Sequence, residues 1–196
     1  MGRPSVQKQR KAEVLDAFLT CASKYGVEGA TLERIAAEAG LKRPLIRHHL
    51  GNRDDMVKAL SEHVITEIGT LIQKTREALE GYPTAKDFID ALYSPQSETD
   101  PRLNIVFQSL THSVDSYPGL REELIAVMQS FYDMASEIMQ RNHPQASKSD
   151  CDIVAQGVVG LYLTTDAMSP LTPPAEWAAA SYSAALRLAD SLRAPG

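Results

Sequence analysis

The chain has 196 residues, which is enough to bury a substantial core in one domain or in two small ones. Its formal net charge of −5 at pH 7 would argue against nucleic acid as a partner if the charge were evenly spread. The longest uncharged stretch, residues 153–165, is too short to cross a bilayer, and the N-terminal residues hold no apolar run typical of a secretion signal. The composition therefore predicts a soluble, cytoplasmic protein.

The charge is divided unevenly along the chain. Residues 1–60 hold 11 Lys and Arg against 7 Asp and Glu, whereas residues 61–196 hold 9 against 18. A basic N-terminal part followed by an acidic remainder would orient the N-terminal part toward a polyanion and keep the rest of the protein away from it.

Apolar residues recur at helical spacing through nearly the whole chain, and no alternating pattern bounded by turn signals predicts a strand. The sequence therefore predicts an all-α protein. Its first helix is expected at about residues 6–24, with the cations of residues 8–11 on a flexible, basic lead-in. Cys21 and Cys151 lie far apart within helical patterns, so we expect buried free thiols and a reducing compartment.

Two short helical patterns follow, and Gly40 joins them. Thr31 can cap the first pattern, in which Ile35, Ala36 and Ala39 recur on one face. Gly40 can adopt the left-handed conformation that stops a helix and turns the chain sharply. The segment thus predicts a short helix that ends in a tight turn.

The second short helix is expected to open at Pro44, because the first turn of a helix has no intrahelical use for its N–H groups. Ile46 and Leu50 are one turn apart and are expected to face inward. Cations and small apolar groups then form the outward face, which suits a DNA groove and gives the pair of helices the arrangement of a helix-turn-helix. The alternative is an amphipathic helix with a solvated basic side. The outward residues are Arg43, Pro44, Leu45, Arg47 and His48.

Asn52 and Asp55 have capping spacing and predict a long helix toward Leu79, long enough to belong to two domains. Further helices are expected downstream, separated by a polar break at 94–101 and a rigid, Pro-rich connection at 170–174. Their expected ranges are 84–93, 102–114, 120–138, a helix capped by Ser149 and Asp152 that runs to about Met168, and 175–193 with Thr172 and Pro173 as its start signal.

A set of motifs within residues 14–59 carries a family resemblance. The motifs are Val14-Leu15-Asp16-Ala17, Gly26, Gly29-Ala30-Thr31, Ile35-Ala36, Ala39-Gly40-Leu41, His48 and Asn52-Arg53-Asp54-Asp55-Met56. Over about a quarter of the chain they resemble the DNA-binding domain of the TetR/AcrR family of transcriptional regulators. The resemblance implies about nine helices, with a helix-turn-helix domain at 1–58 and an effector-binding and dimerisation domain at 59–196. It also implies a homodimer that binds a short palindromic operator, usually as a repressor, and lets go when a small molecule enters its larger domain.

The expected DNA contacts have two roles, base readout and phosphate binding. Arg43 is the candidate for base readout, since a guanidinium can bond a guanine edge at two points. Thr31 could bond phosphate or simply cap its helix. Thymine methyl contacts are expected from Pro44 and Leu45, phosphate contacts from Arg47, His48, Arg53 and Lys58, and either role from Lys42 and His49.

Three positions depart from the usual family pattern. Lys42 stands where a Ser or Thr commonly caps the second short helix. Arg47 stands where Tyr is common, and a permanent charge in place of a neutral hydroxyl should steepen the salt dependence of DNA binding. Phe18 and Ala22 exchange a usual small and a usual large residue one turn apart, which would roughly conserve core volume.

Small residues are concentrated in the last two expected helices, where they let helix axes approach closely and lie beside large apolar side chains. Packing within the chain is one explanation of this surface. The resemblance implies another, a four-helix bundle between two copies across a two-fold axis. The predicted interface residues are Gly157, Gly160, Leu161, Trp177, Ala184 and Leu188.

Aromatic, flexible or polar residues in the apolar helices of the C-terminal domain are the candidates for an effector pocket, although a plain core also holds such residues. Their mixture suits an amphipathic organic ligand of moderate size. The candidates are Phe107, Gln108, His112, Met128, Phe131, Tyr132, Tyr162, Thr165, Asp166 and Met168.

Other classes of function have sequence signatures of their own. This sequence holds no Gly-x-Ser-x-Gly elbow, no Gly-rich phosphate loop and no dinucleotide fingerprint, so neither an enzyme nor a cofactor is expected. His48 and His49 are adjacent and would not chelate one metal ion from a helix. A regulator that its ligand activates or retains on DNA would share these features, and an architectural DNA-binding protein would differ in having little sequence preference.

Overall fold

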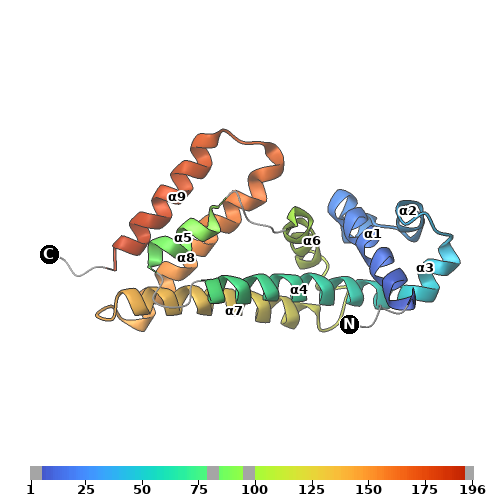
Figure 1. Cartoon of the computed structure of the whole chain (residues 1–196), viewed down its shortest axis with the longest axis horizontal. Coiled ribbons are helices and arrows are strands. Elements are labelled where there is room, and N and C mark those ends of the chain that lie inside the picture. Colours follow the sequence, from blue (N-terminus) through green and yellow to red (C-terminus); the bar gives the residue numbers. More distant parts are fainter. Residues whose placement is uncertain (1–5, 79–83, 95–99, 193–196) are drawn as a thin grey trace. The chain divides into compact units, whose positions relative to one another are not determined.

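The computed structural model describes residues 6–78, 84–94 and 100–192, and within these ranges the chain is all-α, without a strand (Figure 1). A 3-10 helix, Ser169–Leu171, separates the last two α-helices. None of the described helices is both long and apolar enough to span a membrane. The helices are α1 (Val6–Gly29), α2 (Leu32–Glu38), α3 (Arg43–Leu50), α4 (Arg53–Ala78), α5 (Ala85–Leu92), α6 (Pro101–Thr111), α7 (Leu120–Asn142), α8 (Lys148–Met168) and α9 (Ala175–Asp190).

The described residues divide into two compact units. The first contains the residues up to Ile68 together with Asp100–Ile125, and the second contains the described residues of 69–99 and those from Ala126 onward. Helix α6 therefore packs with the N-terminal helices, mainly against α1. The functional boundary predicted after residue 58 stays a prediction.

The core of the first unit joins α1, α3, α4 and α6. Phe18 of α1, Ile46 of α3, Leu60 of α4 and Val106 of α6 are fully buried in one apolar cluster. Burying side chains of this size stabilises the unit by about 2 kcal/mol each. The two α3 anchors predicted from spacing, Ile46 and Leu50, both belong to this cluster.

Helix α1 is longer than expected, because it continues to Gly29 instead of ending near Lys24. Gly26, with φ +73°, interrupts the helix, and one further turn follows. The basic lead-in is also helical, and Arg10 donates a 2.7 Å hydrogen bond to Glu13 within it. The sequence pattern predicts an end of α1 near this interruption. The last turn is held by contacts from other helices, which a local pattern does not reveal.

The local cap and turn signals of the helix-turn-helix are confirmed. Thr31 Oγ1 accepts from the backbone N–H of Arg34 at 3.4 Å, and Gly40 has φ +63°. Asn52 and Asp55 bond each other's backbone N–H groups, both at 3.0 Å. These caps satisfy N–H groups that the first turn of a helix leaves unbonded.

The start of α8 corrects a predicted cap. Ser147 accepts from the backbone N–H of Asp150 at 3.1 Å, two residues before the expected pair of Ser149 and Asp152. The sequence here contains two overlapping Ser-x-x-Asp frames, and either could cap a helix. Asp152 is instead bonded at 2.5 Å by the hydroxyl of Ser136 from α7, a tertiary contact that spacing does not reveal.

The end of α6 also falls earlier than expected, at Thr111 instead of about residue 114. The carbonyl oxygen of Gln108 accepts a hydrogen bond from the hydroxyl of Thr111 at 2.6 Å. The same oxygen lies 2.8 Å from Nδ1 of His112. Such side-chain bonds compete with the backbone ladder and favour a turn. Helix α9 ends at Asp190, before the expected residue 193, which lies outside the described residues.

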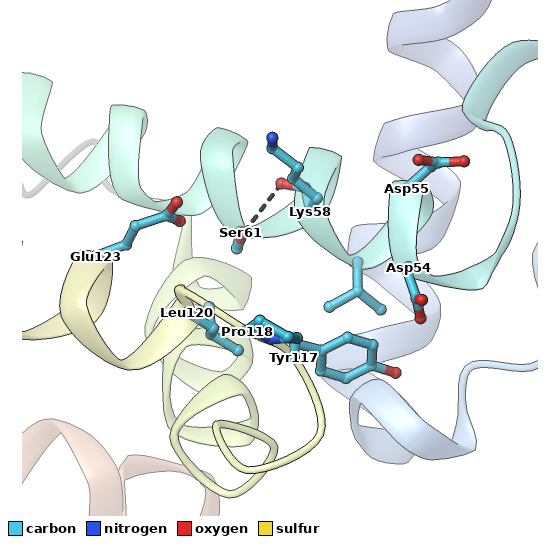
Figure 2. A pocket seen from close by; sticks show the side chains of 9 residues that line it. Asp54, Asp55, Lys58, Ser61, Tyr117, Pro118, Leu120 and Glu123 are labelled. Atoms are coloured by element: carbon cyan, nitrogen blue, oxygen red, sulfur yellow. Dashed lines mark hydrogen bonds between the residues drawn. The ribbon is translucent and has the colours of Figure 1, made fainter.

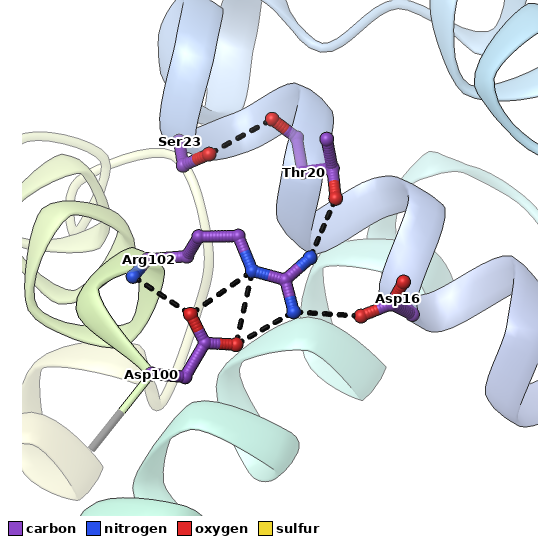
Figure 3. A network of polar contacts seen from close by, with 5 residues as sticks. All are labelled: Asp16, Thr20, Ser23, Asp100 and Arg102. Carbon is purple, nitrogen blue, oxygen red and sulfur yellow. Dashed lines mark hydrogen bonds and ion pairs between the residues drawn. The ribbon is translucent and has the colours of Figure 1, made fainter. Parts of the chain in front are cut away.

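A polar network ties α6 to α1 within the first unit (Figure 3). The Arg102 guanidinium donates to Asp100 at 2.6 Å, to Asp16 at 2.8 Å and to Thr20 at 2.6 Å. The hydrogen bonds from Arg102 hold the pKa of Asp100 below its usual value. One arginine thus joins the start of α6 to two turns of α1.

The second unit is built on α8 and α9, which lie side by side (Figure 1). Val158 of α8 and Ala185 of α9 are fully buried there. The Tyr182 hydroxyl of α9 donates to Asp90 of α5 at 2.7 Å. Helix α5 is thereby fixed against α9.

Both cysteines are buried and free, as predicted. Cys21 lies in α1 and Cys151 in α8. Burial raises the pKa of each thiol, so little reactive thiolate forms near neutral pH.

Candidate nucleic-acid interface

Helix α3 has one buried face and one exposed face, as its sequence predicts. Ile46 has no exposed surface and Leu50 is 5% exposed. The opposite face presents cations and apolar groups to solvent, with Leu45 at 43% exposure. The exposed residues here are Lys42, Arg43, Pro44, Leu45, Arg47 and His48, and His49 is half-buried.

The first turn of α3 explains why this helix can begin without a side-chain cap. Lys42 occupies the cap position, and its side chain makes no cap hydrogen bond. A cap side chain would bond one of the next N–H groups, but Pro44 has none and Leu45 N–H already donates to Lys42 O at 2.9 Å. A Ser or Thr at position 42 would therefore gain little here, and the cation is tolerated.

Arg43, the predicted base reader, is paired with a carboxylate from the preceding helix. Its Nη2 lies 2.8 Å from Oε1 of Glu33 in α2, and the two side chains are 56% and 74% exposed. An exposed pair of this kind contributes about 0–1 kcal/mol to the stability of the fold.

Arg47 lines a hollow of about 360 Å³ at the foot of α3. Arg53 and the backbone at the start of α4 line the same hollow. Two guanidinium groups beside a helix N-terminus suit an anion, and Oε2 of Glu28 lies 3.8 Å from Nη2 of Arg53. The remaining lining residues are Leu32, Gly51, Asn52 and Met56.

Arg53 has a structural role that the sequence did not reveal. Its guanidinium donates to the carbonyls of Val27 at 2.5 Å and Ala30 at 2.9 Å, and it lies 5.4 Å from the centre of the Phe18 ring. The predicted phosphate contact would have to share this guanidinium. Its acceptors lie 23 and 26 residues earlier in the chain, where no local spacing rule applies.

Lys58, His48 and His49 are further predicted DNA contacts, and Lys58 lies apart from the two histidines. Lys58 is exposed and lines a different hollow of about 200 Å³ at the start of α4, which Tyr117 of the turn before α7 and Glu123 of α7 also line (Figure 2). The rings of His48 and His49 meet edge to face at 5.2 Å. Within the described ranges, no group of three His, Cys, Asp or Glu residues could hold a metal ion.

Comparison with known proteins supports the family resemblance. Residues 14–60 match the sequence profile described as "Bacterial regulatory proteins, tetR family". Residues 14–60 are thus similar to the DNA-binding domain of the TetR family. The chain is 27% identical over 165 residues to the HTH-type transcriptional regulator BetI of Paraburkholderia phytofirmans, covering 83% of this chain and 85% of that one. Its matches to other BetI regulators span 44% of their length.

Solved structures show the same fold over nearly the whole chain. A TetR-family regulator from Cytophaga hutchinsonii matches with a TM-score of 0.77 at 13% identity, covering 100% of both chains. FadR of Bacillus subtilis, solved in complex with stearoyl-CoA, matches with a TM-score of 0.65 at 18% identity, covering 92% of this chain and 96% of that one. The chain thus combines a segment similar to TetR-family DNA-binding domains with an all-α fold shared by solved transcriptional regulators.

The predicted effector residues fall in both units. Phe107, Gln108 and His112 belong to the first unit, whereas the others lie on α7 and α8 in the second. Phe131 and Tyr162 meet edge to face, with ring centres 6.4 Å apart. The remaining α7 and α8 residues are Met128, Tyr132, Thr165, Asp166 and Met168.

Two tyrosines that the sequence analysis missed extend this aromatic cluster. The ring of Tyr93 packs edge to face on Tyr162 at 6.1 Å and on Tyr182 at 5.7 Å. Burial raises the pKa of Tyr93, so its phenol stays neutral. Tyr93 follows the end of α5 and Tyr182 lies in α9, and no sequence pattern links them.

The predicted dimer residues of α8 and α9 divide between two environments. A Cβ added at Gly157 would lie 3.0 Å from a methyl carbon of Leu188, so Gly157 serves the packing of α8 on α9 within the chain. A Cβ at Gly160 would meet nothing within 4 Å. Trp177 is 59% exposed, Leu188 is 36% exposed, and Leu161 and Ala184 are half-buried.

Proposed function

We propose that this protein is a DNA-binding transcriptional regulator of the TetR family, a homodimeric, ligand-responsive repressor that binds a palindromic operator through α3 and is released by a small organic effector. The observation that carries the proposal is the exposed face of α3, on which Arg43 and Arg47 lie beside apolar Pro44 and Leu45. A basic and apolar helix face on a helix-turn-helix suits the major groove, where base edges and methyl groups are read.

The contacts divide by chemistry. Arg43 reads a guanine at O6 and N7, and Pro44 and Leu45 pack on thymine methyl groups. Arg47 and Arg53 take a phosphate at the hollow below α3, which fixes register and affinity. Further phosphate contacts come from His48 and Lys58, and supporting contacts from Thr31, Lys42 and His49.

Dimerisation through α8 and α9 is supported by large apolar side chains that remain more than half exposed. Trp177 is 59% exposed and Ile153 is 66% exposed, and Gly160 leaves open space beside α8. In a dimer, binding of one helix-turn-helix to its half-site raises the effective concentration of the second at the other half-site. A single short helix lacks this gain in affinity. Trp177→Glu should convert the dimer to a monomer in sedimentation analysis without lowering the stability of the folded chain. A variant that stays dimeric contradicts this interface.

An effector site is supported by the aromatic cluster of α7 and α8 in the second unit. Phe131, Tyr162 and Tyr93 offer apolar rings, and Thr165 adds a polar group nearby in α8. Such a lining suits an amphipathic organic molecule. The similarity in fold to FadR, whose solved complex holds stearoyl-CoA, supports a ligand-responsive reading of this domain.

Selection of duplexes from random DNA tests the proposal. We expect a palindrome with a guanine in each half-site, and Arg43→Ala should lose about 1–3 kcal/mol of discrimination at that guanine. The absence of any preferred sequence would instead support an architectural protein. A ligand that strengthens operator binding would show a regulator that its effector retains on DNA.

A further inference from the structure

Glu33 is a carboxylate that reaches the DNA-facing surface of α3. Its Oε1 lies 2.8 Å from Nη2 of Arg43, and its side chain is 74% exposed. This ion pair between Glu33 and Arg43 joins α2 to α3. Glu33 is not the cap of α2, because Thr31 takes that role.

The stability of the fold does not explain this pair. Exposed ion pairs contribute about 0–1 kcal/mol, and α2 and α3 already share a buried apolar core through Ile35 and Ile46. A negative side chain beside Arg43 also repels DNA phosphates. Glu33 therefore lowers affinity for DNA of any sequence. Its place in the first turn of α2 favours the helix dipole, but this does not require a pair with Arg43.

The geometry indicates a benefit of the pair itself. A guanidinium carries five N–H donors, and the ion pair with Glu33 is made at Nη2, which leaves the donors on the other nitrogens for a guanine edge. An arginine that is already oriented loses less conformational entropy when it makes a bidentate contact. An arginine whose charge is partly neutralised is also less attracted to phosphates at other sequences.

We propose that Glu33 is a specificity-determining residue: its carboxylate orients Arg43 toward a guanine and weakens binding to DNA of other sequence. This inference rests on the proposed function, in which Arg43 reads a base. Glu33 thus exchanges total affinity for a larger ratio of specific to non-specific binding.

The test compares Glu33→Gln with the wild type on two duplexes, the one selected from random DNA and a scrambled duplex of equal length and composition, at one salt concentration. Glu33→Gln should bind the scrambled duplex about 5-fold more tightly and lose about 3-fold in the specific to non-specific ratio. Glu38→Gln is the matched control, because Glu38 lies on the same helix but pairs with Lys24 at 3.5 Å, and it should leave the ratio unchanged.

Two further variants separate this inference from the proposed function. In an Arg43→Ala background, Glu33→Gln should still strengthen binding to the scrambled duplex but should no longer change the ratio. A ratio that Glu33→Gln leaves unchanged or raises, while Arg43→Ala lowers it, overturns the role of Glu33 alone. If Arg43→Ala keeps the wild-type ratio, Arg43 reads no base, and both the contact assigned to it and this inference are overturned.

Discussion

The hydroxyl oxygen of Ser109 in α6 accepts a 2.7 Å hydrogen bond from the backbone N–H of Val27, 82 residues earlier in α1. Gly26, with φ +73° and ψ 165°, turns this N–H away from the helical ladder. Ser109 therefore supplies the acceptor that the interrupted helix lacks. Arg53 binds the carbonyls of the same turn, so α4 and α6 together hold the end of α1.

Ser109→Ala should lower the free energy of unfolding by about 1–2 kcal/mol, because it leaves the Val27 N–H without this acceptor in a partly buried site. Urea unfolding measures the change. Ser23→Ala is the control, since its hydroxyl only donates to Thr20 O, at 2.9 Å, within α1 and should cost little. Equal losses for the two variants would show that the Ser109 bond has no special role.

Arg47→Tyr should reduce the slope of log affinity against log salt by about one unit, because it removes one cation from a phosphate contact. Binding to the selected duplex is measured across a salt series. Arg121→Tyr is the comparison, because Arg121 is an exposed cation of the same unit that pairs with Asp115 at 2.5 Å. An unchanged slope for Arg47→Tyr would show that Arg47 does not touch phosphate.

Phe18 and Ala22 are both buried, at 0% and 1% exposure, one turn apart in α1. Phe18→Ala alone should cost about 3–5 kcal/mol through the cavity it leaves, and Ala22→Phe alone about 1–3 kcal/mol through overpacking. The double variant moves the ring by one turn and should cost less than the sum of the two. Chemical unfolding of all four proteins gives the coupling. A strictly additive result would contradict compensated repacking.

Asp100→Asn tests the network in Figure 3, since an asparagine can still cap α6 but has no charge for Arg102. The lowered pKa of Asp100 means that its charge stabilises the fold above the unfolded value of about 4, and that this stability is lost as pH falls through the folded pKa. Near neutral pH the variant should be about 1 kcal/mol less stable, and the difference should shrink below pH of about 4.

Thermal unfolding across a pH series gives this difference. Asp115→Asn serves as the comparison, because its carboxylate pairs with Arg121 while 90% exposed, and an exposed pair contributes little. A gap between wild type and Asp100→Asn that persists unchanged at low pH would show that the charge of Asp100 is not what stabilises α6.

Some features of the site follow directly from short-range sequence signals. Thr31, Gly40, Pro44 and the pair formed by Asn52 and Asp55 act within one helical turn, so their spacing alone predicts caps and turns. Where two such signals overlap, as at residues 147–152, spacing does not choose between them. In the folded chain Ser147 caps α8, and Asp152 instead accepts a hydrogen bond from Ser136 of α7.

The sequence by itself determined the all-α fold, the helix-turn-helix and the inward and outward faces of α3, because helical periodicity and capping depend on residues only a few positions apart. Only the tertiary structure decided that Ser109 holds the interrupted end of α1, that Arg53 binds carbonyls of α1, and that Glu33 pairs with Arg43. These partners lie 10 to 82 residues apart, and the packing of whole helices brings them together.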